Sequence, residues 1–203
     1  GPNLVDDECK QILEILKKLE PKPDYLVISG STPSGVPEDY YEQIISIAEK
    51  MDCRVVVDTS GKHLKQAAKK GVFLLKPNMR ELGSLAGNTI ESEAHQMEAA
   101  REIVDSGQAE VVVVSLGAGG ALLVTADKSE QLRTPTVPIR SKLGAGDSMV
   151  AGIILKLAQG ESIRDATLYG IAAGAATVTT EGTELCSKSD TDRLFERLKE
   201  NES

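Results

Sequence analysis

The sequence has few aromatic residues and no tryptophan. Aromatic side chains make up 3% of its 203 residues, so a core must be built mainly from Val, Ile, Leu and Ala. Hydrophobic residues nevertheless reach 40% and charged residues 27%, which are ordinary proportions for a globular protein. A chain of this length is long enough to bury a substantial core.

Cysteine is scarce as well. The three thiols, Cys9, Cys53 and Cys186, are odd in number and lack the close spacing of a metal site. They argue against a disulfide framework and favour a reducing compartment. The sequence contains no apolar run that could span a membrane and no recognisable signal peptide. We therefore expect a cytoplasmic protein with no membrane partner.

Positive charge is outnumbered by negative charge. The chain carries 23 Lys and Arg residues against 31 Asp and Glu residues, a net charge of -8. This balance argues against nucleic acid and membrane surfaces as partners. It also opposes binding of small anions, so a phosphate ligand must be captured locally by backbone N–H groups and a few cationic side chains.

Strand and helix patterns alternate along most of the chain. Continuous apolar strands separated by amphipathic helices predict an α/β fold with a mostly parallel sheet, helices on both faces and therefore three layers. After Gly119-Gly120, two strands joined by a polar turn predict an antiparallel hairpin at one edge. No repeat or linker interrupts the pattern, so we expect one domain over residues 1–203. The expected strands are 24–29, 53–58, 72–76, 110–116, 121–125 and 130–137, and the expected helices are 6–20, 38–51, 63–70, 91–106, 147–158, 162–179 and 188–200.

Polar residues collect where the first four predicted strands end. In an open α/β sheet, ligands bind outside the carboxyl ends of the strands, so these positions predict a binding site. The alternative is that the loops after strands are polar in any fold of this class. The segments concerned are "SGSTPSG" after the first strand, "DTSG" after the second, "KPNMRE" after the third and "SLGAGG" after the fourth.

The segment "KLGAGDSMVAG" places small residues and a carboxylate at the start of an apolar helix. Helix N-termini attract anions, and glycine lets the backbone approach an oxyanion closely. Gly144, Ala145 and Gly146 therefore suit a transferring phosphoryl group, and Asp147 could accept a proton from an attacking hydroxyl. An ordinary Asp-capped helix uses the same residue types, so the turn alone leaves both interpretations open.

Two further motifs allow more than one interpretation. Asn78 and Glu81 can face the same side of a helical turn and suit Mg²⁺, which takes few direct protein ligands. The alternative for this pair is a capping box, in which Asn78 caps the helix. The segment 115–122 resembles half of a dinucleotide fingerprint, but a strand follows it where that fingerprint needs a helix. A tight hairpin turn explains its glycines.

Taken together, these motifs resemble the ribokinase-like (PfkB) sugar kinase family, and most closely its minor-type 6-phosphofructokinase branch. "KLGAGDSMVAG" is similar to the family's C-terminal signature, and "KPNMREL" to its Lys-Pro-Asn segment with an N-x-x-E motif. "SGSTPSGVP" and "VVDTSG" are similar to strand-end segments of the phosphofructokinase branch. The resemblance implies a ribokinase-like fold and ATP-dependent phosphoryl transfer to a phosphorylated ketohexose, with fructose 6-phosphate converted to fructose 1,6-bisphosphate.

The resemblance also implies roles for individual residues. Asp147 would be the general base, with the turn formed by Gly144, Ala145 and Gly146 as the anion hole. Asn78 and Glu81 would hold Mg²⁺ through water or ATP. The remaining implied contacts are Lys76, Asn78, Glu81, Ser115 and Gly117 to Mg–ATP, and Ser31 and Asp58 to the sugar phosphate.

Several features depart from the family pattern. Lys142 stands where the family usually has Thr, while Ser141 before it fits the family pattern. These two positions lie near a monovalent-cation site in relatives, so K⁺ stays open as a cofactor. Glu184 stands where the nearest relatives carry Arg, which is a further departure. The chain opens "GPNLVDDE" without Met, and we expect it to be the C-terminal two-thirds of a longer kinase that forms a homodimer through a preceding lid. Without that lid, we expect this chain alone to bind ATP weakly and to phosphorylate sugar poorly or not at all. The alternatives are a tagatose-6-phosphate kinase, a 1-phosphofructokinase, or a truncated nucleotide-binding module without catalytic activity.

Overall fold

The computed structural model describes residues 4–31, 33 and 35–200. Thr32 and Ser34, which belong to the polar loop predicted after the first strand, lie outside the described residues. The chain divides into two compact units, a first unit of Gly1–Val112 with Val124–Asp127 and a second unit of Val113–Leu123 with Lys128–Ser203. Among the described residues, no helix combines the length and the apolar character needed to cross a membrane.

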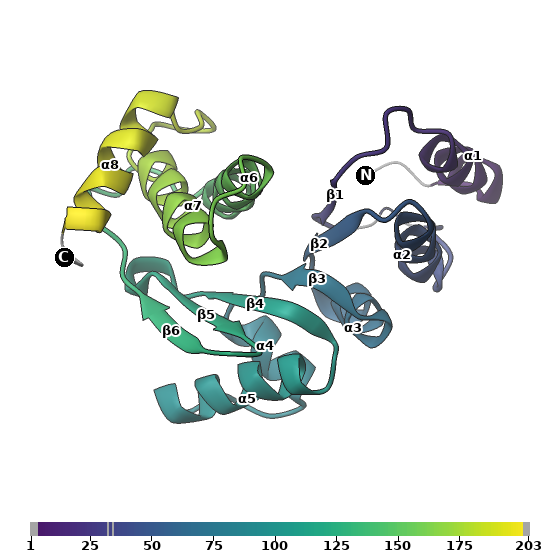
Figure 1. The fold of residues 1–203 in the computed structure, drawn as a ribbon, viewed down its shortest axis with the longest axis horizontal. Helices are drawn as coiled ribbons and strands as arrows, with labels where there is room; N and C mark the ends of the chain where they lie inside the picture. The colour runs from purple at the N-terminus through teal and green to yellow at the C-terminus, as the bar shows by residue number, and fades with distance from the viewer. Residues whose placement is uncertain (1–3, 32, 34, 201–203) are drawn as a thin grey trace. The chain divides into compact units, whose positions relative to one another are not determined.

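Six strands follow one another in the sheet in chain order (Figure 1). The first three pairings, from β1 to β4, are parallel. The connections 116–120 and 126–128 are too short for the crossover that parallel neighbours need, so β4, β5 and β6 run antiparallel. The predicted mixed α/β sheet with a hairpin at its edge is confirmed. The strands are β1 (Tyr25–Ser29), β2 (Arg54–Asp58), β3 (Val72–Leu75), β4 (Ala109–Ser115), β5 (Ala121–Thr125) and β6 (Ser129–Leu132).

The last strand is shorter than predicted. β6 ends at Leu132, whereas the sequence pattern predicted a strand over 130–137. Pro135 lies in the predicted segment and has no N–H group to donate to a strand ladder. The sequence pattern predicted a longer strand because apolar and polar residues go on alternating after Leu132, where the backbone pairing ends.

The central part of β2 is buried on both faces, whereas Val27 of the neighbouring strand β1 is 41% exposed. The β2 residues Val56 and Val57 are 0% exposed, and Val56 pairs in register with Val27 of β1 and Leu74 of β3. Five helices accompany these strands, and each packs against the next along the chain. They are α1 (Asp6–Lys17), α2 (Tyr40–Lys50), α3 (Gly61–Lys70), α4 (Met79–Ala86) and α5 (Glu93–Asp105).

In the described part of the second unit, the α-helices are α6 (Ala145–Ala158), α7 (Ile163–Thr177) and α8 (Lys188–Glu200), which lie side by side (Figure 1). Glycines allow α6 and α7 to approach closely. A Cβ atom on Gly152 would lie 3.0 Å from the Gly170 Cα, and one on Gly170 would lie 2.6 Å from the Ile153 Cγ1. Both positions must stay without a side chain for this packing, which holds α6 against α7.

Candidate active site

In the first unit, an ion pair joins the carboxyl ends of β2 and β3. Asp58 is the last residue of β2, and Lys76 directly follows β3. The Lys76 N–H donates to the Val57 carbonyl oxygen at 3.0 Å, which extends the pairing of the two strands by one residue. The Lys76 Nζ lies 3.0 Å from the Asp58 Oδ1, with the side chains 6% and 17% exposed. This pairing holds the lysine ammonium at the end of the sheet where ligands bind in such folds.

The backbone after β1 is tied to the end of β2. The Gly30 N–H donates to the Asp58 carbonyl oxygen at 3.0 Å, and the Thr59 hydroxyl donates to the Gly30 carbonyl oxygen at 2.6 Å. Ser31 follows Gly30 and is exposed. Thr59 is 5% exposed and was not predicted as a site residue. Its only sequence signal is its position directly after Asp58 in the strand-end segment.

Asn78 and Glu81 form a capping box at the start of α4, as one of the two sequence interpretations predicted. The Glu81 N–H donates to the Asn78 Oδ1 at 2.9 Å, and the Asn78 N–H donates to the Glu81 Oε2 at 2.9 Å. The cap also fixes the position of the Glu81 carboxylate, whose other oxygen, Oε1, is not part of the capping box. Together with the Asn78 carboxamide, this carboxylate fits a Mg²⁺ ion that keeps its water and phosphate ligands. No cluster of three or more His, Cys, Asp or Glu residues able to hold a metal occurs in the described part of the chain.

In the second unit, Gly144 is the N-cap of α6, with a φ of 73° in the left-handed region that favours glycine. The Ser148 N–H donates to the Gly144 carbonyl oxygen at 2.8 Å and closes the first turn of the helix. N–H groups at the start of a helix have no intrahelical acceptor and attract anions; Ala145 and Gly146 contribute such groups. Asp147 is exposed in the same turn.

Two close approaches hold this turn in place. A Cβ atom on Gly144 would lie 2.7 Å from the Leu185 Cδ2, and one on Gly174 would lie 3.1 Å from the Ala145 carbonyl oxygen. The turn is therefore confined by the loop after α7 on one side and by α7 itself on the other. A confined turn keeps its N–H groups in place, as electrostatic preorganisation requires.

The glycine-rich segment after β4 is a tight hairpin turn, as predicted. Ser115 ends β4, and Gly117–Gly119 form a single turn of 3₁₀ helix. The Leu116 N–H donates to the Gly120 carbonyl oxygen at 2.9 Å. Gly120 has a φ of 88°, and a Cβ atom there would lie 2.0 Å from the Leu132 carbonyl oxygen, so the position requires glycine.

The segments that the resemblance associates with K⁺ are linked to each other. The Arg140 Nη1 lies 2.8 Å from the Glu181 Oε1, and the Ser141 hydroxyl donates to the Gly182 carbonyl oxygen at 2.7 Å. The Thr180 hydroxyl donates to the Glu184 carbonyl oxygen. Each of these carbonyl oxygens accepts a hydrogen bond from a hydroxyl of the same region.

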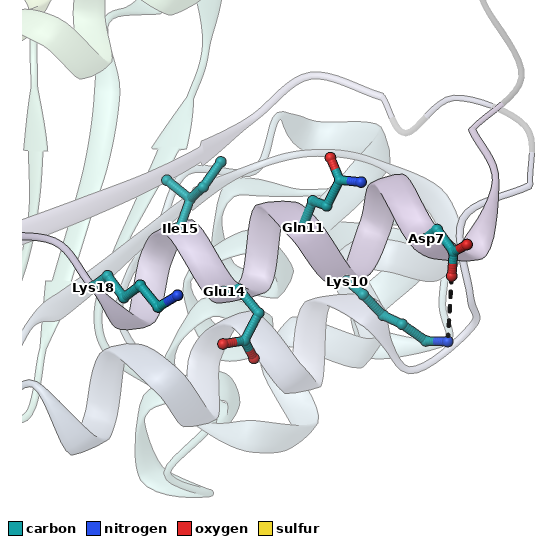
Figure 2. A pocket seen from close by; sticks show the side chains of 6 residues that line it. All are labelled: Asp7, Lys10, Gln11, Glu14, Ile15 and Lys18. Atoms are coloured by element: carbon teal, nitrogen blue, oxygen red, sulfur yellow. Dashed lines mark ion pairs between the residues drawn. The ribbon is translucent and has the colours of Figure 1, made fainter.

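A pocket along α1 lies outside these groups (Figure 2). Its lining includes Lys10 and Asp7, whose Nζ and Oδ1 atoms form an ion pair at 3.7 Å, and both side chains are more than 70% exposed. Ile15 contributes the apolar part of the lining. None of the residues predicted from the sequence lines this pocket, and its charges are solvated, so we assign it no chemistry.

The predicted site residues belong to both units. Within the first unit, the structure brings Asp58 and Lys76 together and pairs Asn78 with Glu81, while Ser31 lies next to the Gly30 contact. Within the second unit, Gly144, Ala145, Gly146 and Asp147 form one turn. The residues of the first unit are Ser31, Asp58, Lys76, Asn78 and Glu81, and those of the second are Ser115, Gly117 and Gly144 to Asp147.

The family model described as pfkB family carbohydrate kinase matches residues 2–190. The chain belongs to the pfkB family of carbohydrate kinases. The family resemblance expected from the sequence motifs is therefore confirmed. ATP-dependent 6-phosphofructokinase isozyme 2 of Mycobacterium tuberculosis is 42% identical over 196 residues, which cover 97% of this chain and 58% of the relative. The 1-phosphofructokinase of Bacillus subtilis is 36% identical over 91% of this chain and 61% of the relative.

Solved structures agree with this family. The crystal structure of phosphofructokinase-2 from Escherichia coli in complex with potassium has a TM-score of 0.92 and 41% identity, covering 97% of this chain and 64% of the other. Arabidopsis thaliana ribokinase complexed with ribose and ATP has a TM-score of 0.73 at 21% identity, covering 96% of this chain and 60% of the other, which shows the shared fold alone. The chain thus spans about three-fifths of the length of the pfkB proteins that it matches.

Proposed function

We propose that this protein catalyses ATP-dependent phosphoryl transfer to fructose 6-phosphate, with fructose 1,6-bisphosphate and ADP as products. The observation that carries the proposal is the α6 N-terminus, where Gly144 in a left-handed conformation presents the Ala145 and Gly146 N–H groups beside the exposed Asp147. The identity to relatives named ATP-dependent 6-phosphofructokinase supports the choice of nucleotide and acceptor.

In this reaction, Asp147 accepts the proton of the attacking sugar hydroxyl. The hydroxyl oxygen forms a bond to the γ-phosphorus as the bond to the leaving oxygen of ADP breaks. Negative charge on the equatorial oxygens of the transferring group is stabilised by the N–H groups of Ala145 and Gly146. These donors are fixed before the reaction, so stabilising the transition state requires little reorganisation.

The residues of the first unit have supporting roles in the proposal. Lys76 provides positive charge for the phosphates, and its ion pair with Asp58 keeps the ammonium in place. Asn78 and Glu81 would hold Mg²⁺ through its water and phosphate ligands, and the bound ion would neutralise charge on ATP. Ser31 and Asp58 would contact the sugar phosphate, and Ser115 and Gly117 the nucleotide.

Two further parts of the proposal concern binding partners. K⁺ is a proposed cofactor near Ser141, as the family resemblance implies. A homodimer is the proposed assembly of the complete kinase, and sedimentation of that kinase measures it. The second candidate activity is that of a 1-phosphofructokinase, which the identity to the Bacillus subtilis relative favours.

The test is an assay of ADP formation with fructose 6-phosphate, fructose 1-phosphate and tagatose 6-phosphate as acceptors, each at saturating Mg–ATP. We expect the highest kcat/KM with fructose 6-phosphate. A higher value with fructose 1-phosphate would establish the second candidate instead. ATP binding without turnover on any of the three acceptors would contradict both activities and leave a nucleotide-binding module.

A further inference from the structure

Thr177, the last residue of α7, makes three polar contacts in the interior of the second unit. Its side chain is 0% exposed. The Thr177 hydroxyl lies 2.7 Å from the Ser148 hydroxyl and 3.0 Å from the Ala173 carbonyl oxygen, and it accepts a hydrogen bond from the Cys186 N–H at 3.2 Å. The Thr177 hydroxyl is the donor to both Ser148 and Ala173, so these two acceptors share its single proton while it accepts from Cys186.

These contacts link three segments. Ser148 directly follows Asp147 in the first turn of α6 and is 6% exposed. Cys186 directly follows Leu185, whose Cδ2 would lie 2.7 Å from a Cβ atom on Gly144. The Thr177 hydroxyl is therefore hydrogen-bonded to Ser148, which follows the proposed general base, and to Cys186. Cys186 in turn follows Leu185, whose side chain lies against Gly144.

The Thr177 methyl group faces the same turn. A Cβ atom on Gly144 would lie 3.9 Å from the Thr177 Cγ2. The side chain thus supports the turn in two separable ways, through apolar contact of its methyl group and through the hydrogen bonds of its hydroxyl. Valine keeps the methyl contact and removes the hydroxyl, whereas serine does the reverse.

We propose that Thr177 is a positioning residue for phosphoryl transfer. Its hydroxyl sets the geometry of the turn Gly144–Asp147 because it is hydrogen-bonded both to Ser148 and to the Leu185–Cys186 segment. This role rests on the proposed function of Asp147. Without the hydroxyl, the buried Ser148 hydroxyl and the Cys186 N–H lose a shared partner. The loop after α7 then separates from α6, and the turn samples orientations in which its N–H groups and carboxylate no longer match the transition state.

The chain offers a matched control on the same helix. Thr167 is also 0% exposed on α7, and its hydroxyl donates to the Ile163 carbonyl oxygen at 2.7 Å, a contact local to the helix. Thr167→Val therefore removes an equally buried hydroxyl with no link to α6 or to the loop after α7. Any effect of Thr177→Val that Thr167→Val reproduces is a general cost of losing a buried hydroxyl.

The experiment compares wild type with Thr177→Val, Thr177→Ser and Thr167→Val by amide hydrogen exchange and by steady-state kinetics. We expect Thr177→Val to speed exchange about tenfold in the turn Gly144–Asp147 and at Cys186, as expected for one lost hydrogen bond. It should lower kcat by about a hundredfold while the KM for ATP changes little. Thr177→Ser should restore both properties, and Thr167→Val should leave them at wild-type values.

The exchange measurement needs no turnover, so it decides the proposal independently of the activity. Unchanged exchange in the turn in Thr177→Val, or an equal change in Thr167→Val, would overturn it. If Thr177→Val does not fold, Ser148→Ala breaks only the contact to α6 and should speed exchange in the turn while Cys186 stays protected. Absence of turnover in wild type would contradict the proposed function, and the exchange comparison would still establish or refute the link.

Discussion

Lys76 and Asp58 lie at the same level in neighbouring parallel strands, with the Lys76 Nζ 3.0 Å from the Asp58 Oδ1. The register that pairs Val57 with Leu75 brings the next residue of each strand side by side. A lysine is rarely buried without a partner, and this one is 6% exposed. The ion pair therefore depends on the strand register, and it places a cation where the parallel sheet ends.

Removing the cation should destabilise the first unit. Lys76→Met leaves the largely buried Asp58 carboxylate without its partner, and we expect the free energy of unfolding to fall by about 3 kcal/mol. Urea denaturation measures the change. Lys10→Met, which breaks an exposed pair with Asp7, serves as the control and should cause no measurable loss. The interpretation fails if Lys76→Met is as stable as wild type, or if adding Asp58→Leu does not recover stability.

Glu81→Gln separates the helix cap from the metal role. Glutamine can accept the same hydrogen bond from the Asn78 N–H, so the capping box and the free energy of unfolding should change by less than about 0.5 kcal/mol. The loss of the negative charge should raise the Mg²⁺ concentration needed for half-maximal ATP binding, which calorimetry at increasing Mg²⁺ measures. If wild type and Glu81→Gln need the same Mg²⁺ concentration for half-maximal ATP binding, Glu81 acts only as a helix cap and takes no part in binding Mg²⁺.

Gly144→Ala should disrupt the turn Gly144–Asp147 more than the strain of alanine in a left-handed conformation explains. Alanine at a φ of 73° costs about 1–2 kcal/mol, and its Cβ atom would also meet Leu185. Gly160 has a φ of 81°, and a Cβ atom there would meet nothing within 4 Å, so Gly160→Ala measures the strain alone. We expect Gly144→Ala to lose activity and Gly160→Ala to keep it, in the same kinetic assay. Adding Leu185→Ala should recover part of the lost stability; no recovery would contradict the steric explanation.

Tyr169 should make stability depend on pH in the alkaline range. Burial, and then the hydrogen bond that its hydroxyl donates to the Asp192 Oδ1 at 2.7 Å, raise its pKa to about 12. The folded protein keeps this proton where the unfolded chain has lost it, so the contribution is complete below about pH 10 and is lost as pH rises towards 12.

Tyr169→Phe tests this dependence. At neutral pH the variant should lose about 1 kcal/mol of stability, because the Asp192 carboxylate loses a buried donor. Between pH 10 and 12 its stability should fall less steeply than that of wild type. Urea denaturation across this range measures both effects, and parallel pH profiles for the two proteins would refute the assignment.

The strand β2 could be predicted from the sequence because burial on both faces produces a continuous apolar run. The strand expected at 53–58 is β2 at Arg54–Asp58. Helix starts were less accurate, since α6 begins at Ala145, two residues before the predicted 147. The reason is Gly144, whose left-handed conformation lets the helix begin at once, and a glycine in sequence does not reveal its φ.

The candidate site was predictable where its contacts are local. Asn78 and Glu81 are three residues apart, so their spacing alone suggested the capping box that the structure contains. The bonds of Thr59 to Gly30 and of Thr177 to Ser148 join residues 29 apart in the chain. Such contacts depend on strand register and helix packing, which the local pattern of residue types does not encode. The residue types of the turn Gly144–Asp147 likewise fit both an anion hole and an ordinary Asp-capped helix, and only the resemblance to the pfkB family favours the first.

Asp147 is the proposed general base for phosphoryl transfer. The most direct test of this role is the initial rate of fructose 1,6-bisphosphate formation by wild type, Asp147→Asn and Asp165→Asn. Asp165 occupies the corresponding position in the first turn of α7, so its variant removes an equivalent charge from a helix N-terminus. We expect Asp147→Asn to lower kcat about a thousandfold with its fold intact, and Asp165→Asn to retain wild-type kcat. A wild-type rate in Asp147→Asn would contradict the account.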